Sequence, residues 1–343
     1  MTCIGKLKTP AALLAGAITL AAATAANAQD VRWQASTWGT PRAATAGAEA
    51  WAEEISRRTD GAFQIAIHYG GELSAPRNNL DNLQLGAFEV ANYCGGFHPG
   101  KHPASMVVEL PFLPFEDPAD QRAAHEAVYS HPVVEKELAR WNAKWMLSSV
   151  LPQMELIGRG DAVETVAGIE GLRVRALGPL GAAYEKAGAV PMSLSAPETY
   201  QALSQGVLDS VAIAHYAMAS YRLYEPSDWV TENLAPGTVN CPWVVSLDAW
   251  NALPQEYRDI ALEARDVAYA AFAEAYGAAV TDAMQAFRDD GLIIVTIPEA
   301  EREKFRELAG VPLWREWIAD AEAKGLPGQE LFDRMMAAVS SEK

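Results

Sequence analysis

The sequence predicts an α/β protein whose chain forms two lobes that face each other across a cleft. Its 343 residues exceed what one ordinary hydrophobic core requires. Strand and helix patterns alternate in two separate stretches, and one later helical pattern is longer than a single lobe needs. Because strand–helix–strand connections build layered open sheets, two such units favour two lobes with a ligand between them.

The first 28 residues have the layout of a cleaved secretory signal peptide. Lys6 and Lys8 precede an alanine- and leucine-rich run over 11–26, and Ala28 ends a small-residue cleavage motif before Gln29. The run is too short and too weakly apolar for a membrane span, and no other run approaches the roughly 20 apolar residues that a span needs. We therefore expect an exported protein that begins at Gln29.

The first α/β unit follows directly. Strand patterns cover 31–36, 63–69 and 88–93, and helical patterns cover 41–58 and 76–85. Pro41 stands in the first turn of one helix, and Gly86 ends the other. Beyond this unit, 125–141 is typical of a helix, and 145–150 and 155–158 are typical of strands that carry the chain to the second lobe.

The second unit repeats the rhythm without repeating the sequence. Strand patterns cover 172–176, 190–192 and 207–213, and helical patterns cover 180–187 and 197–205. Ser195 and Glu198 have the spacing of a capping box at the start of the second helix. A second passage between the lobes is expected near Asn240, before a strand at 243–247.

A long helical pattern covers 254–290 and ends at Gly291. At 1.5 Å per residue it would extend on the order of 50 Å, enough to brace both lobes. A break at Gly277 is the alternative. A strand at 292–296 and several short helices complete the chain.

One ordered pair of motifs carries most of the functional information. The first is Gly171-Leu172-Arg173-Val174-Arg175, and the second is Tyr200-Gln201-Ala202-Leu203 followed by Gly206-Val207-Leu208-Asp209. Arg175 ends a strand just before Gly178 and Pro179, at the edge where open α/β sheets bind ligands. A guanidinium at such an edge suits a carboxylate, because its planar fork donates two parallel hydrogen bonds.

This pair resembles the signature of the solute receptors of tripartite ATP-independent periplasmic (TRAP) transporters. The resemblance implies a two-lobed fold like that of periplasmic binding proteins, with a long helix spanning both lobes. It also implies that Arg175 grips a ligand carboxylate, that the protein works in the periplasm, and that its partners are the integral membrane subunits of a permease. It implies no enzymatic activity and no cofactor, and we expect a monomer.

On this basis the chain is divided by segment. We expect a signal peptide at 1–28, the first part of lobe I at 29–152 and the first part of lobe II at 153–241. The chain then returns to lobe I at 242–281 with the long helix, and 282–343 forms the C-terminal part of lobe II.

The sequence departs from the relatives that bind sugar acids. Glu155 falls where those relatives carry a second arginine that faces the ligand, and Ser210 with 211–214 replaces their Gly-Gln-Glu-Asn-Pro. The groups that read sugar hydroxyls are therefore missing. Aromatic residues are expected near the cleft instead: Trp38, Tyr93, Phe97, Tyr216 and Trp243.

Two ligand classes remain open. An acid such as Glu155 beside aromatic rings would hold an onium group, so a betaine or dimethylsulfoniopropionate is one candidate. A plain small hydroxy, keto or dicarboxylic acid is the other. Asn240 is a further candidate for a hydrogen bond to the ligand, and Asn92 a weaker one.

Other functions have less support. A net charge of −17 disfavours nucleic-acid binding. Catalytic, phosphate-binding and zinc-protease motifs are missing from the sequence, and Pro99 and Pro103 prevent the helix that would bring His98 and His102 together on a metal. An exported cleft enzyme and a ligand-presenting partner of a sensor kinase remain as alternatives. Cys94 and Cys241 either pair or stay free.

Overall fold

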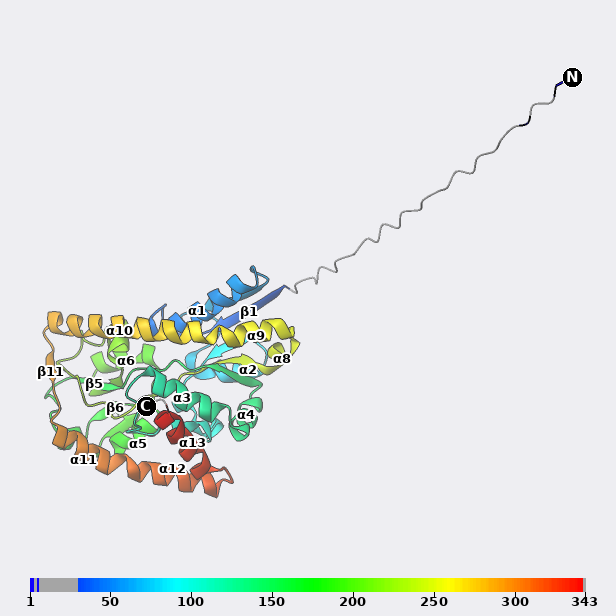
Figure 1. Ribbon diagram of the computed structural model, residues 1–343. Coiled ribbons are helices and arrows are strands. Elements are labelled where there is room, and N and C mark those ends of the chain that lie inside the picture. Colours follow the sequence, from blue (N-terminus) through cyan, green and yellow to red (C-terminus); the bar gives the residue numbers. More distant parts are fainter. Residues whose placement is uncertain (3–4, 6–29, 342–343) are drawn as a thin grey trace.

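The computed structural model describes residues 1–2, 5 and 30–341, and the expected signal peptide lies almost entirely outside these residues. Two mixed sheets form the core of two bodies that lie side by side along α10 (Figure 1). This is the α/β, two-lobed architecture expected from the alternating patterns. Within the described part of the chain, no helix is both long enough and apolar enough to cross a bilayer.

The first sheet has five strands in the order β2-β1-β3-β10-β4. β1 lies parallel to β2 and β3, whereas β10 is antiparallel to both β3 and β4. The strands are β1 (Val31–Ser36), β2 (Phe63–His68), β3 (Val90–Asn92), β4 (Ala143–Leu147) and β10 (Trp243–Ser246). A strand from the last third of the chain thus lies inside a sheet that the first third begins.

The second sheet has six strands in the order β11-β9-β5-β8-β6-β7. β6 is parallel to β7 and β8, and β5 is antiparallel to β8 and β9. The strands are β5 (Glu155–Gly158), β6 (Arg173–Arg175), β7 (Val190–Met192), β8 (Ser210–Ile213), β9 (Trp229–Thr231) and β11 (Ile293–Val295). β9 is a strand that the sequence patterns did not predict.

Helices cover both sheets. Those of the first two thirds are α1 (Ala43–Arg58), α2 (Asn79–Gln84), α3 (Pro118–Tyr129), α4 (Pro132–Ala139), α5 (Gly178–Lys186), α6 (Ala196–Ser204) and α7 (His215–Ser220), with short 3₁₀ turns at Pro76–Asn78, Gly95–Phe97, Pro99–Lys101, Ser105–Glu109 and Val166–Ile169. The later ones are α8 (Leu247–Ala252), α9 (Gln255–Glu263), α10 (Arg265–Asp290), α11 (Glu299–Ala309), α12 (Val311–Ala323) and α13 (Gly328–Ser341). The capping box of Ser195 and Glu198 is present at the start of α6.

The single helix expected over 125–141 is wrong, because α3 and α4 are separate. α3 begins at Pro118, where the Asp117 carboxylate accepts hydrogen bonds from two backbone N–H groups. α4 begins at Pro132, with the His131 ring capping it. Since proline has no N–H and restricts the residue before it, Pro132 starts a new helix rather than continuing the old one.

The long helix is present, and it spans both bodies as expected (Figure 1). α9 and α10 are separated only at Ala264, which itself keeps helical dihedral angles. α10 contacts α1 and β4 of the first body and α7 and β11 of the second. Gly277 does not break it, and Gly291 ends it in the left-handed conformation that favours glycine, with φ of 86°.

The contact of α10 with α1 explains one glycine. A methyl group on Gly47 of α1 would lie 2.3 Å from the ring of Phe272, which is fully buried. Only glycine lets the two helices approach this closely.

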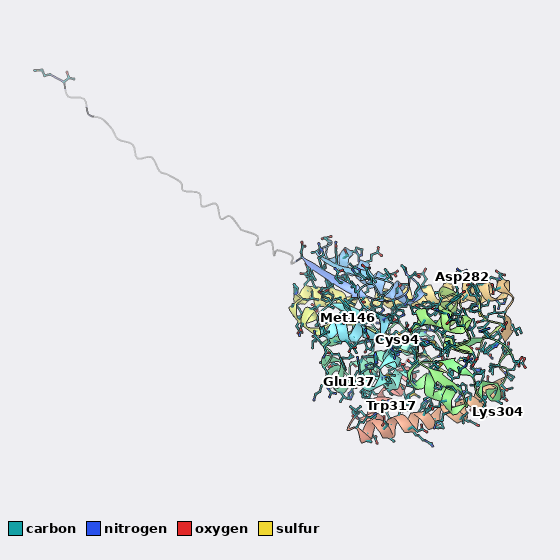
Figure 2. All side chains as sticks on the ribbon, turned by 180° about the vertical axis from the view of Figure 1, so that it is seen from behind. Cys94, Glu137, Met146, Asp282, Lys304 and Trp317 are labelled. Carbon is teal, nitrogen blue, oxygen red and sulfur yellow. A yellow bond between two sulfur atoms is a disulfide. The ribbon has the colours of Figure 1, made fainter. Side chains whose placement is uncertain are left out.

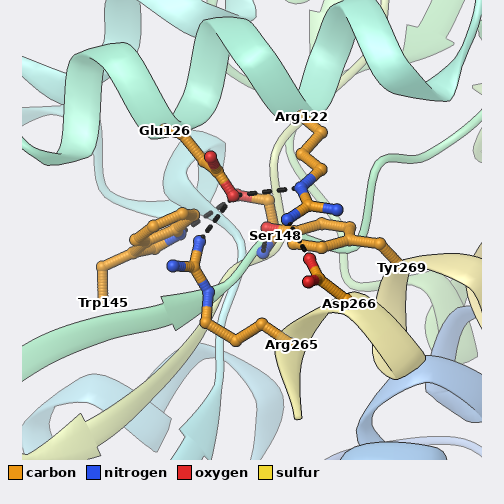
Figure 3. A network of polar contacts seen from close by, with 7 residues as sticks. All are labelled: Arg122, Glu126, Trp145, Ser148, Arg265, Asp266 and Tyr269. Atoms are coloured by element: carbon orange, nitrogen blue, oxygen red, sulfur yellow. Dashed lines mark hydrogen bonds and ion pairs between the residues drawn. The ribbon is translucent and has the colours of Figure 1, made fainter. Parts of the chain in front are cut away.

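A polar network fixes the start of α10 to α3 (Figure 3). Glu126 accepts hydrogen bonds from Arg122, at 3.0 Å, and from Arg265, at 2.8 Å. Arg122 also pairs with Asp266 at 2.5 Å and lies over the ring of Tyr269. The Tyr269 hydroxyl accepts a hydrogen bond from the Ser148 backbone N–H, so the network reaches the segment that leaves the first sheet.

Two connecting segments run together between the sheets, one from β4 to β5 and the other from β9 to β10. The Ser149 hydroxyl donates to the carbonyl of Cys241 at 2.7 Å, and the Thr238 hydroxyl donates to that of Leu151 at 3.0 Å. The Met154 N–H donates to the Gly237 carbonyl. Asn240 lies on the second of these segments, where the passage was expected.

The lobe division by residue number stays a prediction. The two sheets draw on the expected segments, but the last helix, α13, packs against α3 beside the first sheet. Leu331, Met335 and Val339 of α13 are buried in the same apolar cluster as Val128 of α3.

Candidate functional site

A cavity lies between the two sheets and is partly open to solvent. The first body contributes residues that follow β1 and β3 and the start of α1. The second body contributes the end of β6, the end of β8 and α7, and the two connecting segments supply the floor. The lining is mainly apolar, including Leu151, Met154, Leu177, Ile213 and Val239.

Arg175 is the last residue of β6, and it lines this cavity. The residue is 4% exposed. Its Nε donates to the carbonyl of Leu194 at 2.9 Å, and its Nη1 donates to that of Ala212 at 3.2 Å. These carbonyls follow β7 and belong to β8, the strands on either side of β6, so the sheet itself fixes the guanidinium.

Burial lowers the pKa of Arg175 to about 10. The side chain therefore stays positively charged at neutral pH, although its desolvation disfavours the charge. Among the described residues, no hydrogen-bond acceptor pairs with its Nη2 atom. Its hydrogen bonds go to neutral carbonyls, and the Glu198 carboxylate acts on it only through space from outside the lining, so this buried cation is suited to an incoming anion.

The charged residues among the described lining of the cavity are both arginines. Arg42, at the start of α1, is a second lining guanidinium, and its side chain lies 5.9 Å from the ring of Trp38. No aspartate or glutamate is among the described residues that line the cavity. The carboxylates that balance other arginines, such as Asp209 with Arg173 at the surface, lie elsewhere.

Of the eight expected site residues, four line the cavity: Trp38, Phe97, Arg175 and Tyr216. The rings of Trp38 and Phe97 meet edge to face, with centroids 6.2 Å apart. Tyr216 packs against Tyr276 of α10. Asn92, the weaker amide candidate, also lines the cavity. Its side chain accepts a hydrogen bond from the Thr37 hydroxyl and donates to backbone carbonyls of the connecting segment.

Glu155 does not line the cavity. Its carboxylate is buried at the start of β5, where it accepts hydrogen bonds from the Thr231 hydroxyl at 2.5 Å and from the backbone N–H groups of Leu234 and Ala235 at 2.9 and 3.0 Å. Burial raises the pKa of this carboxyl to about 7. Glu155 therefore organises the connection after β9 instead of facing a ligand.

Three other expected residues also lie outside the lining. The Asn240 amide donates to the Tyr129 hydroxyl at 2.8 Å, and neither residue lines the cavity. The ring of Tyr93 packs edge to face on His102. Trp243 is 1% exposed and belongs to the core of the first sheet.

Cys94 and Cys241 form a disulfide, and both line the cavity. The bond joins the end of β3 to the segment just before β10, and Cys94 lies near the middle of the molecule (Figure 2). It closes a loop of 147 residues. Removing such a cross-link typically costs about 2–5 kcal/mol of stability.

Sequence reasoning missed Arg42 and Tyr221, which also line the cavity. A signal for Arg42 exists in the sequence. A cation at the start of a helix is disfavoured by the helix dipole, and the first turn of α1 has no acidic residue that would compensate. An arginine in such a place needs another reason, and the cavity supplies one.

The structure offers no metal centre within its described residues. His98 and His102 each contact a backbone carbonyl, that of Arg77 and that of Gly95 respectively. They do not converge on a common point that a metal could occupy.

The fold and the cavity define a class of protein: a bilobed receptor that holds a small solute between two α/β bodies. Residues 35–320 match the model of the bacterial extracellular solute-binding proteins, family 7, and the chain belongs to this family. The resemblance to TRAP solute receptors is thereby confirmed. Members of this family are transport receptors, not enzymes.

Solved structures share the whole fold. A TRAP solute-binding protein of Rhodoferax ferrireducens, in complex with benzoate, superimposes with a TM-score of 0.81 at 20% identity and covers 91% of this chain and 98% of its own. One from Bordetella bronchiseptica, with bound mandelate, has a TM-score of 0.80 at 20% identity and covers 91% and 100%. One from Sulfitobacter, with bound galacturonate, has a TM-score of 0.76.

Sequence relatives match shorter stretches. A monocarboxylate 2-oxoacid-binding periplasmic protein of Nostoc is 28% identical over 244 residues, which are 67% of this chain and 64% of that protein. A solute-binding protein of Verminephrobacter eiseniae is 28% identical over 166 residues, or 47% and 48%. The chain therefore spans about half to two thirds of the length of these two relatives.

Proposed function

We propose that this chain is the periplasmic receptor of a TRAP transporter for a small carboxylic acid with an apolar or aromatic body. Arg175 grips the carboxylate, the apolar lining covers the rest of the molecule, and the two bodies close around it. The loaded receptor then delivers the acid, as a monomer, to integral membrane permease subunits. A buried arginine in a cavity without a carboxylate is the observation that carries this proposal.

The lining favours an apolar body over a sugar acid. Trp38, Phe97 and Leu177 supply surface that gains from covering carbon, whereas sugar hydroxyls would need polar partners there. Structural relatives that hold benzoate and mandelate point the same way, as does a relative named for monocarboxylate 2-oxoacids.

An onium zwitterion is disfavoured by the same geometry. Its cationic end would need the acid that Glu155 was expected to supply, but Glu155 is engaged by Thr231 and two backbone N–H groups outside the cavity. Two guanidiniums in the lining would also repel the cation. The aromatic rings alone remain, and we therefore favour the plain acid.

A binding screen tests this function. Purified protein is mixed separately with benzoate, mandelate, pyruvate, galacturonate, glycine betaine and dimethylsulfoniopropionate, and unfolding is followed by thermal shift and affinity by calorimetry. We expect an apolar or aromatic acid to raise the stability by about 2.7 kcal/mol at a concentration of 100 Kd. Tightest binding of a betaine, or turnover of any bound compound, would overturn the proposal.

A further inference from the structure

Two polar groups in the cavity have unused hydrogen-bonding capacity. The Nη1 of Arg42 donates to the backbone carbonyls of Trp38, at 2.5 Å, and Thr40, at 3.0 Å. Within residues 30–341, no hydrogen-bond acceptor pairs with its Nη2 or Nε atom. The hydroxyl of Tyr221 is buried, and it has no partner in the described part of the chain.

These two groups come from opposite bodies. Arg42 stands at the start of α1, beside the first sheet, and Tyr221 follows α7, beside the second. They meet at Gly39, where an added methyl group would lie 2.9 Å from the Arg42 Nη1 and 2.8 Å from the Tyr221 hydroxyl. Gly39 has a φ of 69°, which also favours glycine, and both polar atoms lie close to the same point beside it.

Tyr221 also lies in the field of both arginines. Burial raises the pKa of its hydroxyl, and Arg42 and Arg175 each oppose that rise. The charges of both arginines therefore act on this hydroxyl, and all three residues line the same cavity. Arg175 itself uses neighbours from the second body only, Leu194 and Ala212.

We propose that Arg42 and Tyr221 form a second polar subsite, which binds an oxygen of the ligand other than the carboxylate held by Arg175. This rests on the proposed receptor function and narrows its substrate class. Because arginine only donates, the ligand atom must accept; because tyrosine both donates and accepts, a hydroxyl satisfies both partners. The favoured ligand is a carboxylic acid that carries a hydroxyl or oxo group on its apolar body.

The position of the subsite ties recognition to closure. Its two halves belong to different bodies, so a ligand oxygen can contact both only when the bodies are together. A contact that exists only in the closed state shifts the population toward that state. An acid without the second oxygen would still be held by Arg175 but would favour closure less.

Tyr221→Phe tests the subsite, because it removes one oxygen and keeps the ring. Calorimetry on the mature chain compares acids that differ by one hydroxyl: benzoate with 3-hydroxybenzoate, and phenylacetate with mandelate. We expect the wild type to prefer the hydroxylated member of at least one pair by about tenfold, and the variant to lose that preference. The variant's affinity for the parent acid should change less than its affinity for the hydroxylated acid.

Two further variants make the outcome decisive. Tyr200→Phe is the control, since the Tyr200 hydroxyl pairs with Glu225 at the surface of α6, and it should leave both affinities unchanged. Arg175→Gln should weaken both members of a pair equally. An equal effect of Tyr221→Phe on both acids, or a wild type with no preference for the hydroxyl, would overturn the subsite but not the receptor. Failure of every acid to bind would overturn both.

Discussion

The cavity and the buried carboxyl groups outside it handle charge in opposite ways. Arg42 and Arg175 place two guanidiniums in a lining whose described residues include no carboxylate. Glu109, Glu137 and Glu155 are buried carboxyls that form no ion pair within the described residues, and burial raises their pKa values to about 8, 7 and 7. A buried carboxyl can lose its charge by binding a proton, whereas arginine keeps its charge at neutral pH. The cavity thus retains a charge that its own lining does not neutralise.

The largest expected effect is on ligand binding. Arg175→Gln removes the charge of the cavity's best-fixed cation, and we expect the affinity for a carboxylate ligand to fall at least about 100-fold, or roughly 3 kcal/mol. Isothermal calorimetry with the best acid from the screen measures this change.

Arg173→Gln is the matched control, two residues earlier on the same strand. Arg173 is exposed and forms its ion pair with Asp209 away from the cavity. Ligand affinity should therefore stay at the wild-type value. If Arg175→Gln bound the acid as tightly as Arg173→Gln and the wild type, the positive charge in the cavity would have no role in ligand binding.

A smaller effect is expected at Glu155, and on stability instead of binding. Glu155→Gln replaces one of the two carboxylate oxygens with an amide N–H₂ group, so at least one of the three donors, from Thr231, Leu234 and Ala235, loses its acceptor. We expect the free energy of unfolding to fall by about 2 kcal/mol, measured by urea denaturation. The affinity for the acid should not change. A clear loss of affinity would indicate that Glu155 takes part in ligand binding.

The smallest effect concerns pH. Burial raises the pKa of Glu109 from 4.5 to about 8, so the folded protein holds a proton that the unfolded chain has already released. The free energy of unfolding should therefore fall as the pH rises from 6.5 to 8. The buried imidazoles of His102, His125 and His215 have lowered pKa values and act in the opposite direction, mainly below about pH 7.

Glu109→Gln isolates this contribution, because the amide mimics the neutral carboxyl. We expect the variant to lose about 1 kcal/mol of the decrease between pH 6.5 and 8, as followed by urea denaturation at both values. Glu185→Gln, on the exposed face of α5, should keep the full decrease. Identical pH profiles for Glu109→Gln and the wild type would contradict the assignment.

Most of the fold could be predicted from local patterns. The strands and helices of both units, the capping box of Ser195 and the long helix through Gly277 all follow from periodicity and end signals. β9 could not, because this three-residue strand, unlike the equally short β3, β6 and β7, stands outside the strand–helix alternation of the two units. The place of β10 between β3 and β4 depends on contacts far apart in the sequence. Pro132 indicated a break in the helix expected over 125–141, but the apolar periodicity on both sides of it favoured one continuous helix.

The site was only half predictable, for a physical reason. Arg175 has a local signal, since a strand end and a following glycine position it. Aromatic residues carry no such signal: Phe97 lines the cavity, while Tyr93 four residues earlier packs against His102. Which way a ring points depends on the packing of both bodies. Glu155 misled for the same reason, because its partners at Thr231, Leu234 and Ala235 are more than 70 residues away.

The strand order of the first sheet constrains how this chain can reach its native state. β10 lies between β3 and β4, so β4 has no neighbour in the sheet until residues 243–246 have been synthesised. By then, all of β5 to β9 has already been synthesised. Completion of the first sheet therefore has to wait for a strand that follows most of the second sheet in the sequence, and the high sequence separation of these pairings makes assembly slow. Formation of the Cys94–Cys241 disulfide would then indicate that β10, which begins just after Cys241, has paired with its neighbours in the sheet.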